Sequence, residues 1–243
     1  MTHSDVNLSM QTLRLHLVDM CRVSQRCVDY SVKAFQLGNP DMIASARENV
    51  FEIDMLHSDI TEFARDLFLR EQTLQGRELR FVLSCMRICD ALKLIHNSAV
   101  EIASNTMRFW GNGGDFALTD FPGMGDSVNR LVQSCAASLT KEEIEPAQMV
   151  LYTDRYEREL VNTFYEWYRS IDPNERMQAH YALAMTRHLS QIVQQTREIA
   201  DAVVFWLDDI DAFLTAQTSE TGLLDQLSLE SIQGVLSAMS QQH

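Results

Sequence analysis

The sequence predicts an all-α protein built as a tandem duplication of a three-helix bundle, with six long helices and a C-terminal segment. Three observations lead to this prediction. The 243 residues include only nine glycines and four prolines, so few residues interrupt long helices. Residues 77–110 carry apolar side chains at alternating steps of three and four, which is typical of a helix with a narrow buried seam. The same pattern returns 97 residues later.

The two seams match residue by residue, and both contain the tripeptide Glu-Ile-Ala. The first seam consists of Cys85, Ile88, Leu92, Ile95, Ala99, Ile102, Thr106 and Phe109, and the second of Ala182, Met185, Leu189, Ile192, Thr196, Ile199, Val203 and Trp206. Because every position is repeated at one offset, we expect two equivalent helices from a duplicated unit, packed about a pseudo-twofold.

In the first half, two helices precede the seam helix. The first is marked by Met10, Leu13, Leu17, Met20 and Cys27, and the second by Ile43, Val50, Ile53, Leu56, Ile60, Phe63 and Leu67. Gly38 closes the first helix, while Asn39 is a suitable N-cap and Pro40 a suitable first-turn residue for the second.

The second half repeats this order. Its leading helix is a shorter segment with Val128, Leu131 and Cys135, and its middle helix carries Met149, Tyr156, Leu160, Phe164 and Trp167. The start of the middle helix stays open, because residues 140–143 form a capping-box pattern whereas Pro146 fits poorly inside a helix. A second capping box at residues 172–175 starts the sixth helix.

These elements divide the chain into four parts. We expect the first bundle at residues 1–110, a Gly-rich linker at 111–125, the second bundle at 126–213 and a tail at 214–243 that could form a short helix.

Composition narrows the classes of function. The net charge of −14, without a cluster of basic residues, argues against nucleic acid as a partner. No apolar run is long enough to span a membrane and no leader sequence opens the chain, which predicts a cytoplasmic protein without direct membrane insertion. The five cysteines lack disulfide-like spacing, so we expect reduced thiols.

Several stretches of this pattern resemble the PhoU family, over most of residues 8–210. They are Glu52-Ile53-Asp54 with Leu56 and Ile60, then Glu78-Leu79-Arg80, Arg87-Ile88, Ile95 and Glu101-Ile102-Ala103, and more loosely Arg187, Leu189, Ile192, Glu198, Ile199 and Ala200. The resemblance implies a regulator of phosphate signalling and uptake.

In that family, paired carboxylates on the second and third helix of each repeat hold clusters of iron or zinc. Most of these acids are absent here. The matching positions are Val50 and Asp54, Lys93 and Asn97, Thr153 and Glu157, and Ser190 and Gln194. One acid per repeat remains, so we expect the iron or zinc clusters to be lost and no cofactor to be bound.

A single metal ion is the remaining metal hypothesis. Asp54 and His57 lie three apart on one helix, with Glu48 and Glu52 nearby, and Glu157 is the surviving acid of the second repeat. A di-iron bundle needs Glu-x-x-His from two helices, which this sequence lacks. The favoured interpretation of these residues is a solvated helix face, and no metal is expected.

No catalytic arrangement stands out, so the sequence predicts that the protein is not an enzyme. We expect a PhoU-like adaptor acting through protein–protein contacts with a phosphate transporter or a sensor kinase. Two alternatives stay open: a metal-binding bundle for storage or metal-dependent regulation, and a helical scaffold unrelated to phosphate. A homodimer is compatible with the sequence.

Overall fold

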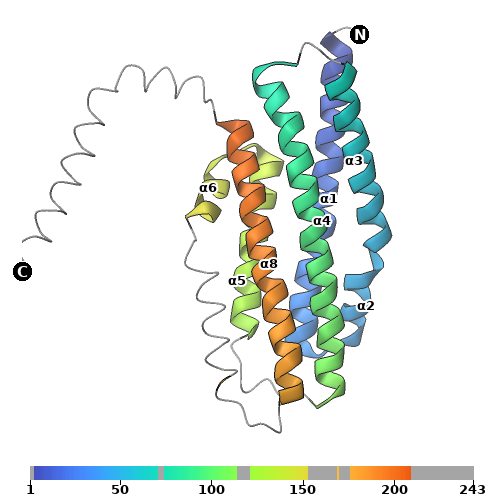
Figure 1. The fold of residues 1–243 in the computed structure, drawn as a ribbon, viewed down its shortest axis with the longest axis vertical. Helices are drawn as coiled ribbons and strands as arrows, with labels where there is room; N and C mark the ends of the chain where they lie inside the picture. Colours follow the sequence, from blue (N-terminus) through green and yellow to red (C-terminus); the bar gives the residue numbers. More distant parts are fainter. Residues whose placement is uncertain (1–2, 71–73, 114–120, 153–168, 170–175, 209–243) are drawn as a thin grey trace, which may run out of the picture. The chain divides into compact units, whose positions relative to one another are not determined.

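The computed structural model describes residues 3–70, 74–113, 121–152, 169 and 176–208. Every regular element in these ranges is an α-helix, and the helices lie side by side as a bundle (Figure 1). They are α1 (His3–Leu37), α2 (Pro40–Glu48), α3 (Val50–Arg70), α4 (Gly76–Gly111), α5 (Phe121–Lys141), α6 (Glu145–Leu151) and α8 (Arg176–Leu207). The predicted all-α fold is confirmed.

Some sequence predictions fall outside the described residues. They concern the linker residues 114–120, most of the middle helix of the second half, the capping box at 172–175 and the tail at 214–243. The helices up to Leu207 form one compact unit with a shared core. The division of this unit into two bundle domains therefore stays a prediction.

The two seam helices, α4 and α8, pack against each other in antiparallel directions (Figure 1). Ser84, early in α4, donates a hydrogen bond to the carbonyl of Ala202, late in α8, at 2.8 Å. Thr106, late in α4, donates to the sulfur of Met185, early in α8, at 3.4 Å. All residues of both predicted seams are buried, none being more than 5% exposed. The predicted seams are therefore confirmed.

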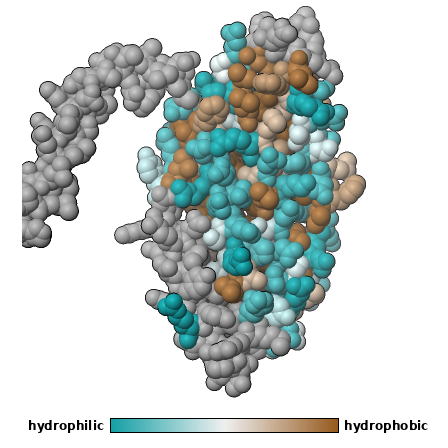
Figure 2. Space-filling view, viewed as in Figure 1, coloured by the Kyte–Doolittle hydropathy of each residue, from teal (hydrophilic) through white to brown (hydrophobic). Residues whose placement is uncertain are grey.

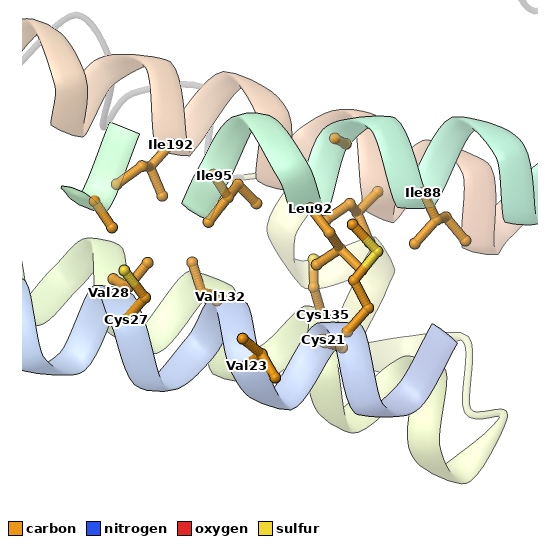
Figure 3. Packing of buried hydrophobic residues seen from close by; sticks show 14 of the residues in the cluster. Cys21, Val23, Cys27, Val28, Ile88, Leu92, Ile95, Val132, Cys135 and Ile192 are labelled. Atoms are coloured by element: carbon orange, nitrogen blue, oxygen red, sulfur yellow. The ribbon is translucent and has the colours of Figure 1, made fainter. Parts of the chain in front are cut away.

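The leading helices α1 and α5 attach to the seam helices at equivalent places. The Ser31 hydroxyl on α1 donates to the carbonyl of Ala99 at 2.7 Å, and the Cys135 thiol on α5 donates to the carbonyl of Thr196 at 3.3 Å. Ala99 and Thr196 are 97 residues apart, the same offset that relates the seams. Figure 3 shows the side chains of α1 and α5 directed toward α4 and α8. The duplication is thus visible in hydrogen bonds as well as in sequence.

The predicted second helix is interrupted. Asn39 caps it as expected, since its side chain accepts from the amide of Asp41 at 2.8 Å. The backbone of Asn49 then leaves the helical region (φ −95°, ψ 12°), so the segment consists of α2 and α3. Val50 follows this break and is 38% exposed, and Phe63 is 39% exposed beside the ring of His16. Placing these two side chains in the buried stripe was wrong.

The predicted linker also extends too far. Helix α5 begins at Phe121, which places Pro122 in its first turn, where proline is tolerated. Thr140 lies inside α5, where its hydroxyl donates to the carbonyl of Ala136 at 2.7 Å, and therefore does not start a capping box. The turn that follows uses Glu142 at a φ of 56°, held by ion pairs with Arg14 and Arg77. Helix α6 then places Pro146 in its first turn.

Gly125, which the sequence assigns to the linker, allows α5 to approach α1 closely. A Cβ atom at this position would lie 2.7 Å from Cγ1 of Val32. Val32 is 2% exposed, and its β-branched side chain has little rotameric freedom in a helix. The glycine is therefore required by contact between helices rather than by a turn.

We predict that Gly125→Ala lowers the free energy of unfolding by about 1–2 kcal/mol. Overpacking typically costs about 1–3 kcal/mol, and the higher helix propensity of alanine offsets up to about 1 kcal/mol. Urea denaturation measures the change. Gly111→Ala is the matched control, because a Cβ atom added there would meet no other atom within 4 Å, and adding Val32→Ala to Gly125→Ala should remove the clash. Equal stability of Gly125→Ala and wild type would contradict the close approach.

His96 is a buried polar side chain on α4. It is 0% exposed, and neither ring nitrogen has a hydrogen-bond partner among the described residues. Burial lowers the pKa of His96, and the charge of Asp54 opposes this shift. An unpaired buried polar group costs about 1–3 kcal/mol, so the ring lowers the stability of the bundle.

We predict that His96→Leu raises the free energy of unfolding at pH 7 by about 1–2 kcal/mol, because it removes this unpaired group. The wild type should also lose stability as the pH falls below about 6.5, since the unfolded chain takes up a proton that the folded chain resists. The variant should lose less over that range. Denaturation curves at several pH values test both effects, with the exposed His180 changed to Leu as the control. A destabilised His96→Leu variant would show that the ring has an unseen partner.

Candidate functional site

The positions that correspond to the family's metal ligands are arranged as an ion pair. Asp54 on α3, the retained acid of the first repeat, lies 3.1 Å from the ammonium nitrogen of Lys93 on α4. Val50 and Asn97, the other two positions, are exposed and offer no carboxylate. A lysine beside one carboxylate opposes a cluster of cations, because the local positive charge is already supplied.

The second repeat shows the same loss where it is described. Ser190 and Gln194 lie on α8, and neither has an acidic side chain. Thr153 and Glu157 lie outside the described residues.

The residues proposed for a single metal site do not form one group. Glu48 is exposed at the end of α2, and Glu52 lines a groove between α1 and α3. Asp54 and His57 instead line a separate hollow of about 380 Å³ beside α4. His57 does have a close carboxylate, but it is Asp90 of α4, whose Oδ1 lies 2.7 Å from Nε2. The sequence analysis missed this pair because the two residues are on different helices.

A groove with a volume of about 950 Å³ lies between α1 and α3. Phe51 on its α3 side is 75% exposed, and Met55, one turn later, is 51% exposed. Large apolar side chains at this exposure mark surfaces that contact other molecules, and phenylalanine and methionine are enriched in protein interfaces. This groove is the candidate docking surface, and we call it the α1–α3 groove.

Charges of both signs surround these apolar side chains. On α1, Arg22 pairs with Asp19 at 3.2 Å and Lys33 pairs with Asp29 at 2.8 Å. Arg26 also lines the groove. Exposed ion pairs of this kind contribute little to stability, so their charges are free to adjust to a partner. An apolar centre with a charged rim suits contact with a protein surface better than it suits catalysis.

Other apolar side chains are exposed elsewhere. Figure 2 shows one largely hydrophilic face on which apolar side chains gather near the end of the bundle where α3 ends and α4 begins. Phe68 is 55% and Leu69 is 68% exposed at the end of α3. We regard this cluster as a secondary surface. No helix in the described part of the chain has the apolar stretch needed to cross a bilayer.

Comparisons with known proteins identify the fold. PhoU from Pseudomonas aeruginosa superposes with a TM-score of 0.73 at 21% sequence identity, covering 83% of this chain and 98% of that structure. The phosphate transport system regulatory protein PhoU from Streptococcus pneumoniae gives a TM-score of 0.69 at 14% identity, covering 84% of this chain and 97% of that one. No curated protein sequence matches the chain.

At these identities the structures establish the fold, and the family model of the PhoU domain adds a sequence match over residues 17–106. That match covers α2 and α3, and most of α1 and α4. It thus includes the Asp54–Lys93 pair and the helices that form the α1–α3 groove. Residues 17–106 thus match the PhoU domain, and the chain has the PhoU fold over most of its length.

Proposed function

We propose that this chain is a non-enzymatic adaptor in phosphate signalling and uptake, which acts by binding a phosphate transporter or its sensor kinase. The PhoU domain supports the link to phosphate transport, and the S. pneumoniae structure of the same fold belongs to a phosphate transport regulator. An adaptor needs an exposed surface for its partner rather than a catalytic centre. The cytoplasmic location stays a prediction.

The α1–α3 groove is the observation on which this proposal rests. Phe51 and Met55 project from α3 while the neighbouring Ile53 is 0% exposed, so α3 has one face in the core and another left open. Keeping two large apolar side chains in water costs free energy that a bound partner would recover. The charged rim adds selectivity for one partner over others.

We predict that the double variant Phe51→Glu and Met55→Glu weakens binding to the transporter or kinase at least about tenfold. The loss of two central apolar contacts typically removes more than about 1.4 kcal/mol of binding free energy. Isothermal titration or surface plasmon resonance with the purified partner measures the change. Thermal unfolding should be nearly unaffected, since both side chains are exposed.

Met149→Glu is the control for this experiment, because Met149 lies on α6 outside the groove and is 70% exposed. Failure of the wild-type protein to bind either partner would reject the adaptor function. Wild-type affinity in the double variant would place the docking surface elsewhere on the bundle.

A metal-binding bundle is the alternative that the Asp54–Lys93 pair opposes. We predict fewer than two iron or zinc ions per chain when the protein is purified without chelator, as measured by elemental analysis. Changing Val50→Asp, Lys93→Glu and Asn97→Asp together restores the family's carboxylates in the first repeat and should increase the bound metal. A wild-type protein that carries a multinuclear iron or zinc cluster would refute the predicted loss of these sites.

A further inference from the structure

Three side chains of different chemistry meet between α3 and α4. They are His57 on α3 and the adjacent residues Cys89 and Asp90 on α4, each of which offers one ligand atom. These three atoms all lie within 4.8 Å of one another. Cys89 is buried, His57 is partly buried and Asp90 is exposed, so the group extends from the core to the surface.

An imidazole nitrogen, a thiolate and a carboxylate are the ligands that zinc prefers. Zinc lies about 2.0–2.2 Å from nitrogen and oxygen and about 2.3 Å from sulfur, so two ligand atoms in a tetrahedral site are about 3.5 Å apart. The present separations bracket this value, since His57 Nε2 and Asp90 Oδ1 are 2.7 Å apart and no pair exceeds 4.8 Å. Small side-chain rotations would bring the three atoms to coordination distance without moving either helix.

We propose that His57, Cys89 and Asp90 bind a single Zn²⁺ ion, with water as the fourth ligand. This site differs from the family's carboxylate clusters in position and in ligand type. His57 lies about one turn beyond Asp54 on α3, and Cys89 lies about one turn before Lys93 on α4. Imidazole and thiolate also favour one zinc ion, whereas sets of oxygen ligands favour harder cations.

The surroundings supply the other parts of a zinc site. His57 lines a hollow of about 380 Å³, which leaves space for the water ligand on the His57 side of the site. The hydroxyl of Thr61 donates to the backbone carbonyl of His57 at 2.7 Å and lies 3.9 Å from the Cys89 sulfur, so it contacts two of the three ligand residues. Two cations, Arg65 and Lys93, line the same hollow, and the charge of Lys93 is offset by its ion pair with Asp54 at 3.1 Å.

Binding exchanges one proton for the metal. Burial raises the pKa of the Cys89 thiol to about 11, so the sulfur carries its proton at neutral pH. When zinc binds, the S–H bond is broken, the Zn–S bond forms and the proton passes to solvent. The apparent affinity should therefore increase up to about tenfold for each unit of rising pH.

Titration of the metal-free, full-length chain with zinc chloride tests this proposal. Calorimetry should show one zinc ion per chain, with proton release that scales with the ionisation enthalpy of the buffer. Cobalt(II) in place of zinc should give a thiolate charge-transfer absorption in the near ultraviolet. Because the test uses the isolated chain, its result is independent of the adaptor function.

Substitution of each ligand should weaken zinc binding at least about tenfold, the lower end of the effect seen for residues behind metal ligands. The variants are His57→Ala, Cys89→Ser and Asp90→Asn, and Cys89→Ser should also abolish the cobalt–thiolate absorption. Asp90 is exposed, so Asp90→Asn should fold normally even if the buried Cys89→Ser is destabilised. Asp59→Asn and His188→Ala, which lie outside the site, should bind zinc like the wild type.

Two results would overturn the proposal. One is the absence of saturable zinc binding by the wild-type chain. The other is binding that survives in all three ligand variants, which would place the ion at other residues.

Discussion

Burial of the two seams between α4 and α8 is the interaction on which the rest of the bundle depends. Each fully buried isoleucine or leucine contributes about 1.5–3 kcal/mol, and the seams carry such residues along most of both helices. The other helices attach to this pair. Hydroxyls of Ser24 and Ser31 on α1 donate to carbonyls of α4, and Cys135 on α5 donates to α8. Small side chains allow these close approaches and satisfy their own polar atoms across the interface.

The sequence could predict this central pair because its pattern is long and regular. A seam repeated over some 30 residues, and again at a constant offset, has few interpretations other than two equivalent helices. The contacts of α4 with α8 run in opposite order along the two helices, from Ser84–Ala202 to Thr106–Met185. The midpoint between these contacts falls near Ile95 on α4 and Ile192 on α8, which are equivalent residues of the two repeats. Figure 3 shows both isoleucines directed into the core. The geometry is that of a pseudo-twofold, as the duplication implied.

The details that the sequence missed depend on contacts between helices. Nothing in the spacing of α2 and α3 indicates that Asn49 breaks the helix, so the exposure of Val50 could not be foreseen. Gly125 belongs to a Gly-rich stretch typical of a linker, yet it lies within helix α5. Glycine is needed there because Val32 leaves no room for a larger side chain. Likewise, Cys89 follows the seam residue Cys85 by four positions, and nothing in that spacing indicates His57, which lies beside Cys89 only because α3 packs on α4. The loss of the family's carboxylates, in contrast, depends only on which residues occupy these positions, so the sequence alone shows it.

The packing of α3 against α4 has a consequence for function. The seam fixes which face of α4 is inward, and α3 covers a neighbouring face of α4, so His57 and Asp54 must both lie along the α3–α4 boundary. The opposite side of α3 is left open, and there Phe51 and Met55 border the groove against α1. One helix therefore separates two surfaces of different chemistry, polar and ligand-bearing on one side and apolar with a charged rim on the other.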